Sequence, residues 1–191
     1  SPMTTTVYNI SGTDASNCVS GINTITITVN TTPTVALSAS SASICLGNTA
    51  TVTPSGANTY TLINTGASIT TNTVVSPSST TVYTVTGTSL AGCLSTPSAI
   101  TVAVNSNPTL TLSTSNATIC NGNSITLTAL GTDTYTWTSG PNTPNYVVSP
   151  SSATVYTVVG TNTLTGCVSS ISTTTISVNP TPVLTVSATA L

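Results

Sequence analysis

The 191-residue sequence contains no Lys, no Arg and no His, and its only acids are Asp14 and Asp133. General acid–base catalysis depends on such side chains, and a Ser, Thr or Cys nucleophile needs a neighbouring base or cation to activate it. The sequence therefore predicts a protein that is not an enzyme. It also predicts no binding of nucleic acid, because affinity for phosphate rests largely on Lys and Arg.

Long apolar runs and groups of metal ligands are scarce as well. No apolar stretch approaches the ~20 residues that span a bilayer, so we expect no membrane insertion. Asp14 and Asp133 occupy different positions in the sequence pattern, and two isolated carboxylates fall short of the roughly six to eight oxygen ligands that calcium takes. Turn residues are the simpler interpretation of both. We expect neither a metal nor any other cofactor.

Thr, Ser, Val and Ile dominate what is present, and they form short alternating runs between Pro, Gly and Asn residues. Such alternation is typical of half-buried β-strands separated by turns. A disordered Ser/Thr-rich chain is the competing interpretation, and the regular alternation of apolar residues argues against it. We predict an all-β protein.

The same sequence pattern recurs along the chain. Residues 76–87 (SPSSTTVYTVTG) match residues 149–160 (SPSSATVYTVVG), and residues 1–12 are a weaker copy. Cys18 and Cys93 keep the spacing that separates these copies. A regular repeat of this kind predicts a tandem array of structural units.

Proline marks the joints of the array, at Pro33, Pro108 and Pro182, since Pro lacks the donor that a strand interior needs. The predicted segments are 1–32, 33–107, 108–181 and 182–191. The two central segments are complete domains, the first supplies the C-terminal strands of a preceding repeat, and the last supplies the first strand of a following one. Two strands alone cannot bury an apolar face, so the first segment needs partner strands from elsewhere.

Short strands that follow one another within about 75 residues predict a small two-sheet sandwich for each complete domain. In the second domain we expect strands at 109–113, 124–129, 134–138, 145–148, 153–161 and 173–178. Its expected core residues are Ile125, Leu127, Tyr135, Trp137, Tyr156, Val158, Ile176 and Val178. The corresponding residues of the first domain are Ala50, Val52, Tyr60, Leu62, Tyr83, Val85, Ile100, Val102 and Val104. Trp137 aligns with Leu62, which indicates a core residue rather than a binding aromatic.

Residues 44–53 (ICLGNTATVT) and 119–128 (ICNGNSITLT), with the shared Ser-Pro and Gly-Cys pairs that follow them, resemble the Ig-like and PKD-like repeats of large Bacteroidota cell-surface proteins. The resemblance implies tandem immunoglobulin-like β-sandwich domains in a linear array. It also implies export by the type IX secretion route and membership of a giant adhesin, a gliding-motility adhesin or a cell-surface filament. Five Cys in such a polar chain agree with an oxidising, extracellular setting.

The five cysteines allow several pairings. Bonds within domains would be Cys45–Cys93 and Cys120–Cys167, but we expect Cys45 before the second strand at one end of the sandwich and Cys93 at the other end. A nine-residue strand between those ends spans ~30 Å, whereas a disulfide needs Cα atoms within ~7 Å. Cys93–Cys120 across a joint and a set of free buried thiols are further alternatives.

We favour a bond between consecutive domains that joins Cys45 to Cys167. In a linear array, the end of one domain at which Cys45 lies should face the end of the next domain at which Cys167 lies. Cys18, Cys93 and Cys120 would then have partners outside this sequence. Such bonds would make the array a stiff rod that transmits tension.

Two functions are compatible with these features. The first is a structural or adhesive stalk segment whose partners are neighbouring repeats of the same chain and identical chains in a fibre, because an uncharged Thr/Ser/Asn surface lacks the usual protection against association. The second is a module that binds glycans or surfaces through its loops. The loops are poor in aromatic residues, which favours the stalk.

Overall fold

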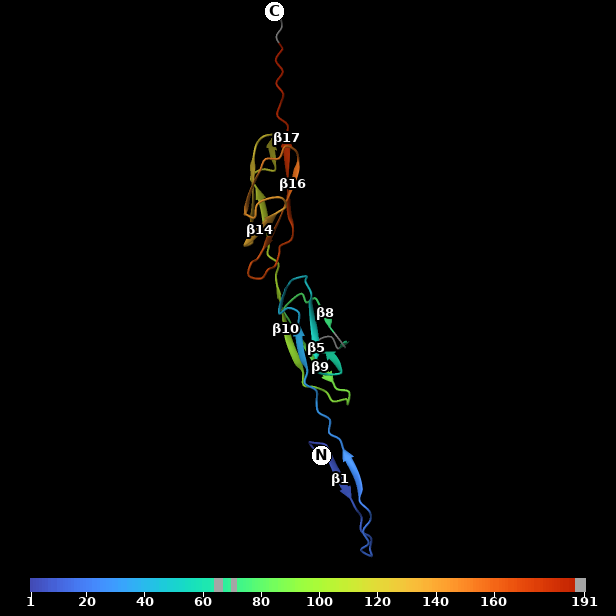
Figure 1. The fold of residues 1–191 in the computed structure, drawn as a ribbon. Helices are drawn as coiled ribbons and strands as arrows, with labels where there is room; N and C mark the ends of the chain where they lie inside the picture. Colours follow the sequence, from blue (N-terminus) through green and yellow to red (C-terminus); the bar gives the residue numbers. More distant parts are fainter. Residues whose placement is uncertain (64–66, 70–71, 188–191) are drawn as a thin grey trace, which may run out of the picture. The chain divides into compact units, whose positions relative to one another are not determined.

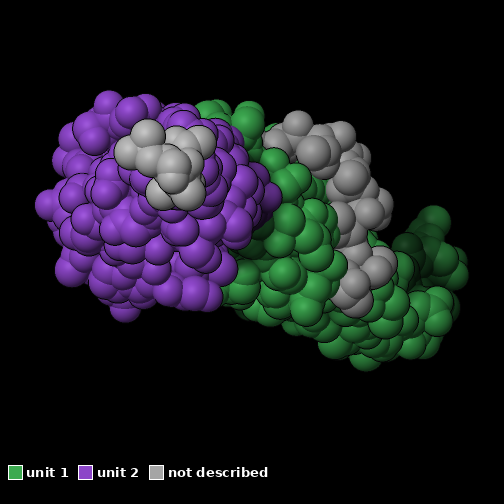
Figure 2. Space-filling view, turned by 90° about the horizontal axis from the view of Figure 1, so that it is seen from above, with its two compact units in different colours: residues 1–42, 49–103 green, residues 43–48, 104–191 purple. Residues whose placement is uncertain are grey.

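The computed structural model describes residues 1–63, 67–69 and 72–187. The described residues form strands joined by turns and irregular segments, with no helix among them, so the all-β prediction is confirmed (Figure 1). Contacts divide the chain into two compact units, one formed by residues 1–42 and 49–103 and the other by residues 43–48 and 104–191 (Figure 2). The short segment 43–48 therefore packs with the second unit, although its neighbours in sequence belong to the first.

The second unit has seven strands from residue 111 onward, and Figure 1 labels β14, β16 and β17 in it. They are β11 (Thr111–Thr114), β12 (Thr118–Cys120), β13 (Ile125–Leu130), β14 (Thr134–Trp137), β15 (Asn145–Val148), β16 (Thr154–Thr161) and β17 (Ser172–Asn179). One sheet has the order β11-β13-β15 and the other has the order β12-β17-β16-β14. The two sheets form the predicted sandwich, with a chain that changes sheet between β11 and β12.

The strand β12 is not among the expected strands. It is only three residues long and pairs in parallel with β17, Cys120 lying opposite Asn179. Cys120 precedes the second strand, β13, as expected, and it lies where β12 meets the turn that leads to that strand. Cys120 ends β12, and the equivalent Cys45 ends β4 (Ser43–Cys45).

The remaining strands precede residue 106. They are β1 (Thr6–Ile10), β2 (Asn23–Ile27), β3 (Ala36–Ala39), β5 (Ala50–Ser55), β6 (Thr59–Leu62), β7 (Ala67–Ile69), β8 (Thr73–Val75), β9 (Thr81–Thr88) and β10 (Ser98–Asn105). The sheets are β3-β5-β8 and β4-β10-β9-β6-β7, with β1-β2 as a separate pair. From β3 onward this order repeats that of the second unit, with β7 added beside β6 at the edge of the larger sheet, because the other strands of the two sequence copies correspond.

Alternating burial along the strands builds the cores. In β13 the buried residues are Ile125, Leu127 and Ala129, and they pack with Trp137 and Ile176 of the opposite sheet. In the first unit Val52, Leu62, Val85 and Val102 are nearly inaccessible, and Ala50, Tyr60 and Tyr83 are buried beside them. Four of the expected core residues are only partly buried, namely Ile100, Val104, Tyr156 and Val178.

Trp137 is 3% exposed and lies against Tyr146. Its indole Nε1–H donates a hydrogen bond to the carbonyl oxygen of Thr143 at 2.9 Å. Its ring meets Tyr146 edge-on with centroids 5.5 Å apart, and Tyr146 meets Tyr156 in the same way at 5.8 Å. Trp137 is thus held inside the sandwich, with its one polar atom satisfied.

The hydroxyl group of Tyr60 fixes the turn before β6. It donates to the carbonyl oxygen of Ala57 at 2.8 Å and accepts from the amide of the same residue at 2.9 Å. In the second unit the hydroxyl of Tyr135 accepts only a longer bond, 3.4 Å, from the amide of Thr132. The hydroxyl of Tyr60 therefore holds its turn more tightly than the hydroxyl of Tyr135 holds the equivalent turn.

Tyr60→Phe should lower the free energy of unfolding of the first unit by about 1–2 kcal/mol, since two backbone groups lose their partner. The matched variant Tyr135→Phe should cost less, because its bond is longer. Denaturant unfolding followed by circular dichroism measures both. Equal losses of unfolding free energy in the two variants would show that the cost does not depend on the strength of these hydroxyl hydrogen bonds.

The first pair of strands, β1 and β2, exposes the face that is buried elsewhere. Tyr8 pairs with Ile25, and the side chains of Tyr8, Ile10 and Ile25 are 41%, 61% and 54% exposed. Their counterparts in β9 and β10 of the next repeat are Tyr83, Val85 and Ile100, of which Val85 is completely buried. The segment 1–32 thus has the strand pair of a repeat without the opposing sheet.

At the C-terminal end, residues 182–187 contain no strand, and residues 188–191 lie outside the described part of the chain. Residues 182–187 of the predicted strand 182–191 pair with no strand among the described residues, whereas the equivalent β11 is held by β13. An unpaired extended segment has no ladder of hydrogen bonds to define it as a strand.

Candidate functional site

Three turns of the same construction follow the strands β1, β9 and β16, and we call them the F–G turns (residues 12–20, 87–95 and 160–169). In each turn, two hydrogen bonds join the glycine at the start to a serine at the end. The serine amide donates to the glycine carbonyl, and the glycine amide donates to the serine hydroxyl oxygen. The serines of the two complete domains, Ser95 and Ser169, are buried. The paired bonds fix the base of each turn.

A cysteine lies near the tip of every F–G turn, directly after a residue with a left-handed backbone. The φ angles are 61° at Asn17 and 82° at Gly92, and 71° at Gly166. Glycine and asparagine accept this conformation more readily than other residues. The left-handed residue reverses the chain, so the cysteine amide bonds back to a side chain in the turn, Asp14 in the first copy and Ser89 in the second.

A second cysteine-bearing turn occurs twice, and we call these the Cys-X-Gly-Asn turns (residues 45–48 and 120–123). In both, the asparagine amide donates to the cysteine carbonyl, at 2.9 Å and 3.0 Å. Gly47 and Gly122 have φ angles of 90° and 88°. A left-handed third residue is the mark of a type II turn. The two turns also share their anchoring, since Leu46 and Asn121 donate to the carbonyl oxygens of Asn105 and Asn179.

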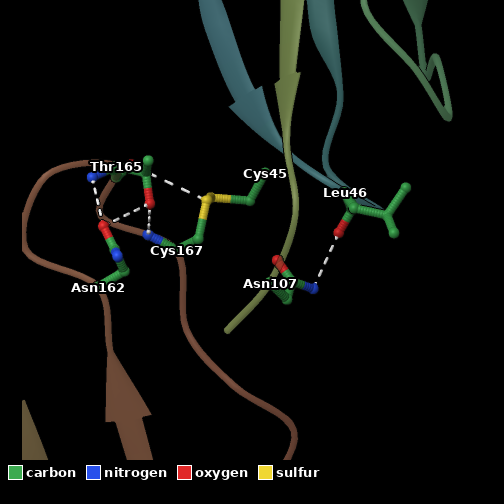
Figure 3. Close-up of a disulfide and its surroundings, with 6 residues drawn as sticks. All are labelled: Cys45, Leu46, Asn107, Asn162, Thr165 and Cys167. Atoms are coloured by element: carbon green, nitrogen blue, oxygen red, sulfur yellow. Dashed lines mark hydrogen bonds between the residues drawn. A yellow bond between two sulfur atoms is a disulfide. The ribbon is translucent and has the colours of Figure 1, made fainter. Parts of the chain in front are cut away.

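The structure joins one member of each kind of turn in a disulfide between Cys45 and Cys167 (Figure 3). Their Cα atoms are 5.5 Å apart, and Cys167 is completely buried whereas Cys45 is partly exposed. The side-chain amide of Asn107 donates to the carbonyl oxygen of Leu46 at 3.2 Å beside the bond. The bonded cysteines are the pair that the sequence analysis favours. The alternatives Cys45–Cys93 and Cys120–Cys167 do not form in this structure.

The other three cysteines have no disulfide, although all lie in the described part of the chain. Cys18 and Cys120 are exposed, and Cys93 is partly buried. The thiol of Cys93 lies 3.8 Å from the carbonyl oxygen of Asn30. The two exposed thiols therefore have the most open surroundings.

Both aspartates brace F–G turns. A carboxylate oxygen of Asp14 accepts from the amides of Ser16 and Cys18 in its own turn. Asp133 lies before β14, and its Oδ2 accepts from the amide of Thr163 at 2.8 Å and from the hydroxyl of Thr163 at 3.2 Å. Asp133 thereby ties the turn that contains Cys167 to the neighbouring strand. Among the residues that the structure describes, no group of three or more potential metal ligands occurs.

Asp133→Ala should speed amide hydrogen exchange in the turn 160–169 by about tenfold, because a charge-assisted hydrogen bond to Thr163 is lost. Asp133→Asn keeps an acceptor oxygen and should have a smaller effect. Exchange measured by mass spectrometry after pepsin digestion tests both variants. Unchanged exchange in Asp133→Ala would mean that the other bonds of the turn are sufficient to hold it.

Tyr83 and Tyr156, in the strands that precede the second and third of these turns, offer no reactive phenolate. Burial raises the pKa of Tyr83, and burial followed by the nearby Tyr146 raises the pKa of Tyr156, partly offset by a hydrogen bond with Thr154. Both phenols are thus neutral at physiological pH, where they contribute packing rather than acid–base chemistry.

Solved structures with a similar arrangement of strands are immunoglobulin-like and fibronectin-like domains. The fibronectin(III)-like modules of Clostridium thermocellum CbhA are 13% identical, with a TM-score of 0.40 over 75% of this chain and 94% of that one. Murine CEACAM1b is 15% identical, with a TM-score of 0.35 over 78% of this chain and 100% of the other. With the two-sheet strand order described above, the domains are immunoglobulin-like β-sandwiches.

A third solved structure matches more of the chain, but with a lower TM-score. It is Bacteroides ovatus SGBP-B in complex with a mixed-linkage heptasaccharide, which is 15% identical with a TM-score of 0.25 over 93% of this chain and 55% of that one. No protein-family model matches the sequence, and no curated protein matches it. Within the described residues, no helix is long and apolar enough to cross a membrane.

Proposed function

We propose that this chain is a non-enzymatic stalk segment of an extracellular filament or giant adhesin, in which immunoglobulin-like repeats supply length and resistance to tension. The observation on which the proposal mainly rests is the Cys45–Cys167 disulfide, which joins residues 122 positions apart in the sequence and in successive repeats. A covalent bond of this reach belongs to an oxidising compartment, in keeping with export to the cell surface.

The disulfide changes how the chain bears load. When the two ends of the chain are pulled, force passes from Cys45 through the sulfur atoms to Cys167 and bypasses every residue between them. Most of both complete repeats lies in that bypassed segment, so neither can be drawn out by its ends. The bond also constrains the unfolded chain, by ~5 kcal/mol in the chain-entropy model for a loop of this size. Both effects suit a tension-bearing element.

The distribution of aromatic and charged residues supports a spacer rather than a ligand-binding module. Of the seven aromatic residues, only Tyr8 is exposed, while Trp137 is buried in the core. Aromatic platforms and charged side chains are the usual means of holding a sugar, and the complete repeats display few of either. Asp14 and Asp133, the only acids, are engaged with backbone amides.

The family resemblance supports the finer parts of the proposal. It suggests a Bacteroidota cell surface, secretion by the type IX route, and a filament or gliding-motility adhesin. The uncharged hydroxyl-rich surface favours lateral association with identical chains, because surfaces without charges lack electrostatic repulsion.

Immunogold labelling of intact source cells and of thin sections of the same cells, with antibodies against residues 33–181, tests the proposal. Gold particles should decorate extracellular fibres along their length. Labelling confined to the cytoplasm would exclude a stalk. Labelling only at fibre tips, with saturable glycan binding by the isolated chain, would assign the repeats to ligand binding instead.

A further inference from the structure

A shallow concavity of about 550 Å³ opens on the second unit beside the exposed thiol of Cys120. The link between β11 and β12, the strand β12 and the start of β13 form its walls, with Asn116, Asn123 and Ser124 among the polar residues. The side chains of Ile119 and Ile125 add apolar surface. The concavity therefore combines an exposed thiol with surroundings that suit a polar peptide turn.

Cys120 has the same local structure as Cys45, whose partner the structure shows. Both cysteines end a short strand, begin a Cys-X-Gly-Asn turn and precede a glycine with a φ angle near 90°. The residue after each donates to the carbonyl oxygen of an asparagine at the end of a long strand, at 2.8 Å for Leu46 and 2.9 Å for Asn121. Because Cys45 is bonded to an F–G turn through Cys167, Cys120 has the geometry to hold such a turn.

The chain exposes one suitable F–G turn of its own, the turn 12–20 with Cys18. It has the same glycine–serine base and the same left-handed residue before the cysteine as the turn that contains Cys167. Cys18 is exposed, whereas Cys93 is partly buried, with its sulfur beside the carbonyl oxygen of Asn30. Cys18 is thus the better placed of the two to reach another molecule.

We infer that Cys120 of one chain forms a disulfide with Cys18 of a second copy, whose F–G turn docks in the concavity beside Cys120. This contact would join two copies of the chain through an F–G turn of one and a Cys-X-Gly-Asn turn of the other. The inference rests on the proposed function for its purpose and on the Cys45–Cys167 bond for its geometry.

The chemistry is a thiol–disulfide exchange with a low-molecular-weight disulfide such as oxidised glutathione. One cysteine thiolate attacks the glutathione disulfide, forms a mixed disulfide and releases one glutathione thiolate. The second cysteine thiolate then attacks the protein sulfur of the mixed disulfide and releases the other. Two protein thiols are oxidised, one glutathione disulfide is reduced to two glutathione molecules, and the two protons of the protein thiols pass through solvent to the glutathione thiolates.

The test is oxidation of the full chain in a glutathione buffer, followed by non-reducing electrophoresis. The wild-type chain should form a ladder of multimers that collapses to monomer with reductant. Cys18→Ser and Cys120→Ser should each abolish the ladder, whereas the control Cys93→Ser should keep it. An equimolar mixture of Cys18→Ser and Cys120→Ser should give dimers and nothing larger, since only one complementary pair of thiols remains.

Chymotryptic peptide mapping should then find residues 18 and 120 in one cross-linked peptide; trypsin is unsuitable because the chain has no Lys or Arg. Dimers formed by Cys18→Ser alone, or a ladder that survives either substitution, would overturn the inference. So would a wild-type chain that stays monomeric while peptide mapping shows Cys45–Cys167 intact. That last result would leave the stalk proposal standing, because it depends on the bond within the chain and on fibre labelling.

Discussion

Pulling the oxidised chain from its two ends should release about 430 Å less contour length than pulling the reduced chain. The bond between Cys45 and Cys167 removes a separation of 122 residues from the extensible path, and each residue contributes roughly 3.5 Å when extended. Single-molecule force spectroscopy with handles at both termini measures the difference directly. The expected effect is large because the bond spans most of two repeats.

The variants for this experiment follow from the five cysteines. Cys45→Ser with Cys167→Ser should extend like the reduced chain, and Cys93→Ser should behave like the oxidised wild type. Bonds within domains, Cys45–Cys93 and Cys120–Cys167, would instead conceal about 95 residues in two separate loops, or about 330 Å. Full extension of the oxidised chain would show that Cys45 and Cys167 are not joined.

Trp137→Ala should lower the free energy of unfolding of the second unit by about 3–5 kcal/mol. The substitution empties a site that is 3% exposed, removes the edge-on contact with Tyr146 and leaves the carbonyl oxygen of Thr143 without its indole donor. Thermal unfolding followed by circular dichroism is the suitable measurement, since Trp137 is the only tryptophan and fluorescence would be lost with it.

Trp137→Leu is the matched control, because Leu62 occupies the equivalent position of the first repeat and is 2% exposed there. Leucine fills part of the volume, so its cost should be smaller than that of alanine. The first unit should unfold as before in both variants. Unchanged stability together with loss of binding to a glycan would make Trp137 a ligand-binding residue and contradict its assignment to the core.

The sequence predicts the long strands well because their residues alternate. In β13 and β16 apolar side chains face the core at every second position, and the predicted ranges 124–129 and 153–161 differ from the observed strands by no more than one residue at an end. The short strands β4 and β12 escape prediction, since three residues are too few for alternation to be recognised. Their pairing with a strand distant in sequence is a tertiary effect.

The arrangement of the cysteines can likewise be predicted only in part from the sequence. Spacing identifies two equivalent sets, and strand length argues against bonds within a domain, but the sequence does not reveal the short strand that Cys45 ends. For the two aspartates, the sequence predicts only that they are turn residues. The bond from Asp133 to Thr163 joins positions 30 residues apart, and no local pattern in the sequence reveals it.

The exposed face of β1 and β2 can be anticipated from the repeat. A residue such as Tyr8 is apolar at a position that is buried in the complete domains, yet the sequence around it contains no opposing strands. Only the period of the repeat relates this exposed position to the buried Tyr83 of the next repeat.

The left-handed residue before each F–G cysteine restricts how such repeats can diverge. Asn17, Gly92 and Gly166 occupy a conformation that a valine, isoleucine or threonine would adopt only with strain. In a family rich in those three residues, drift at this single position would misplace the neighbouring sulfur and convert a cross-linking repeat into a passive spacer. The dipeptides Asn-Cys and Gly-Cys thus provide a simple criterion for telling the two kinds of repeat apart in longer sequences.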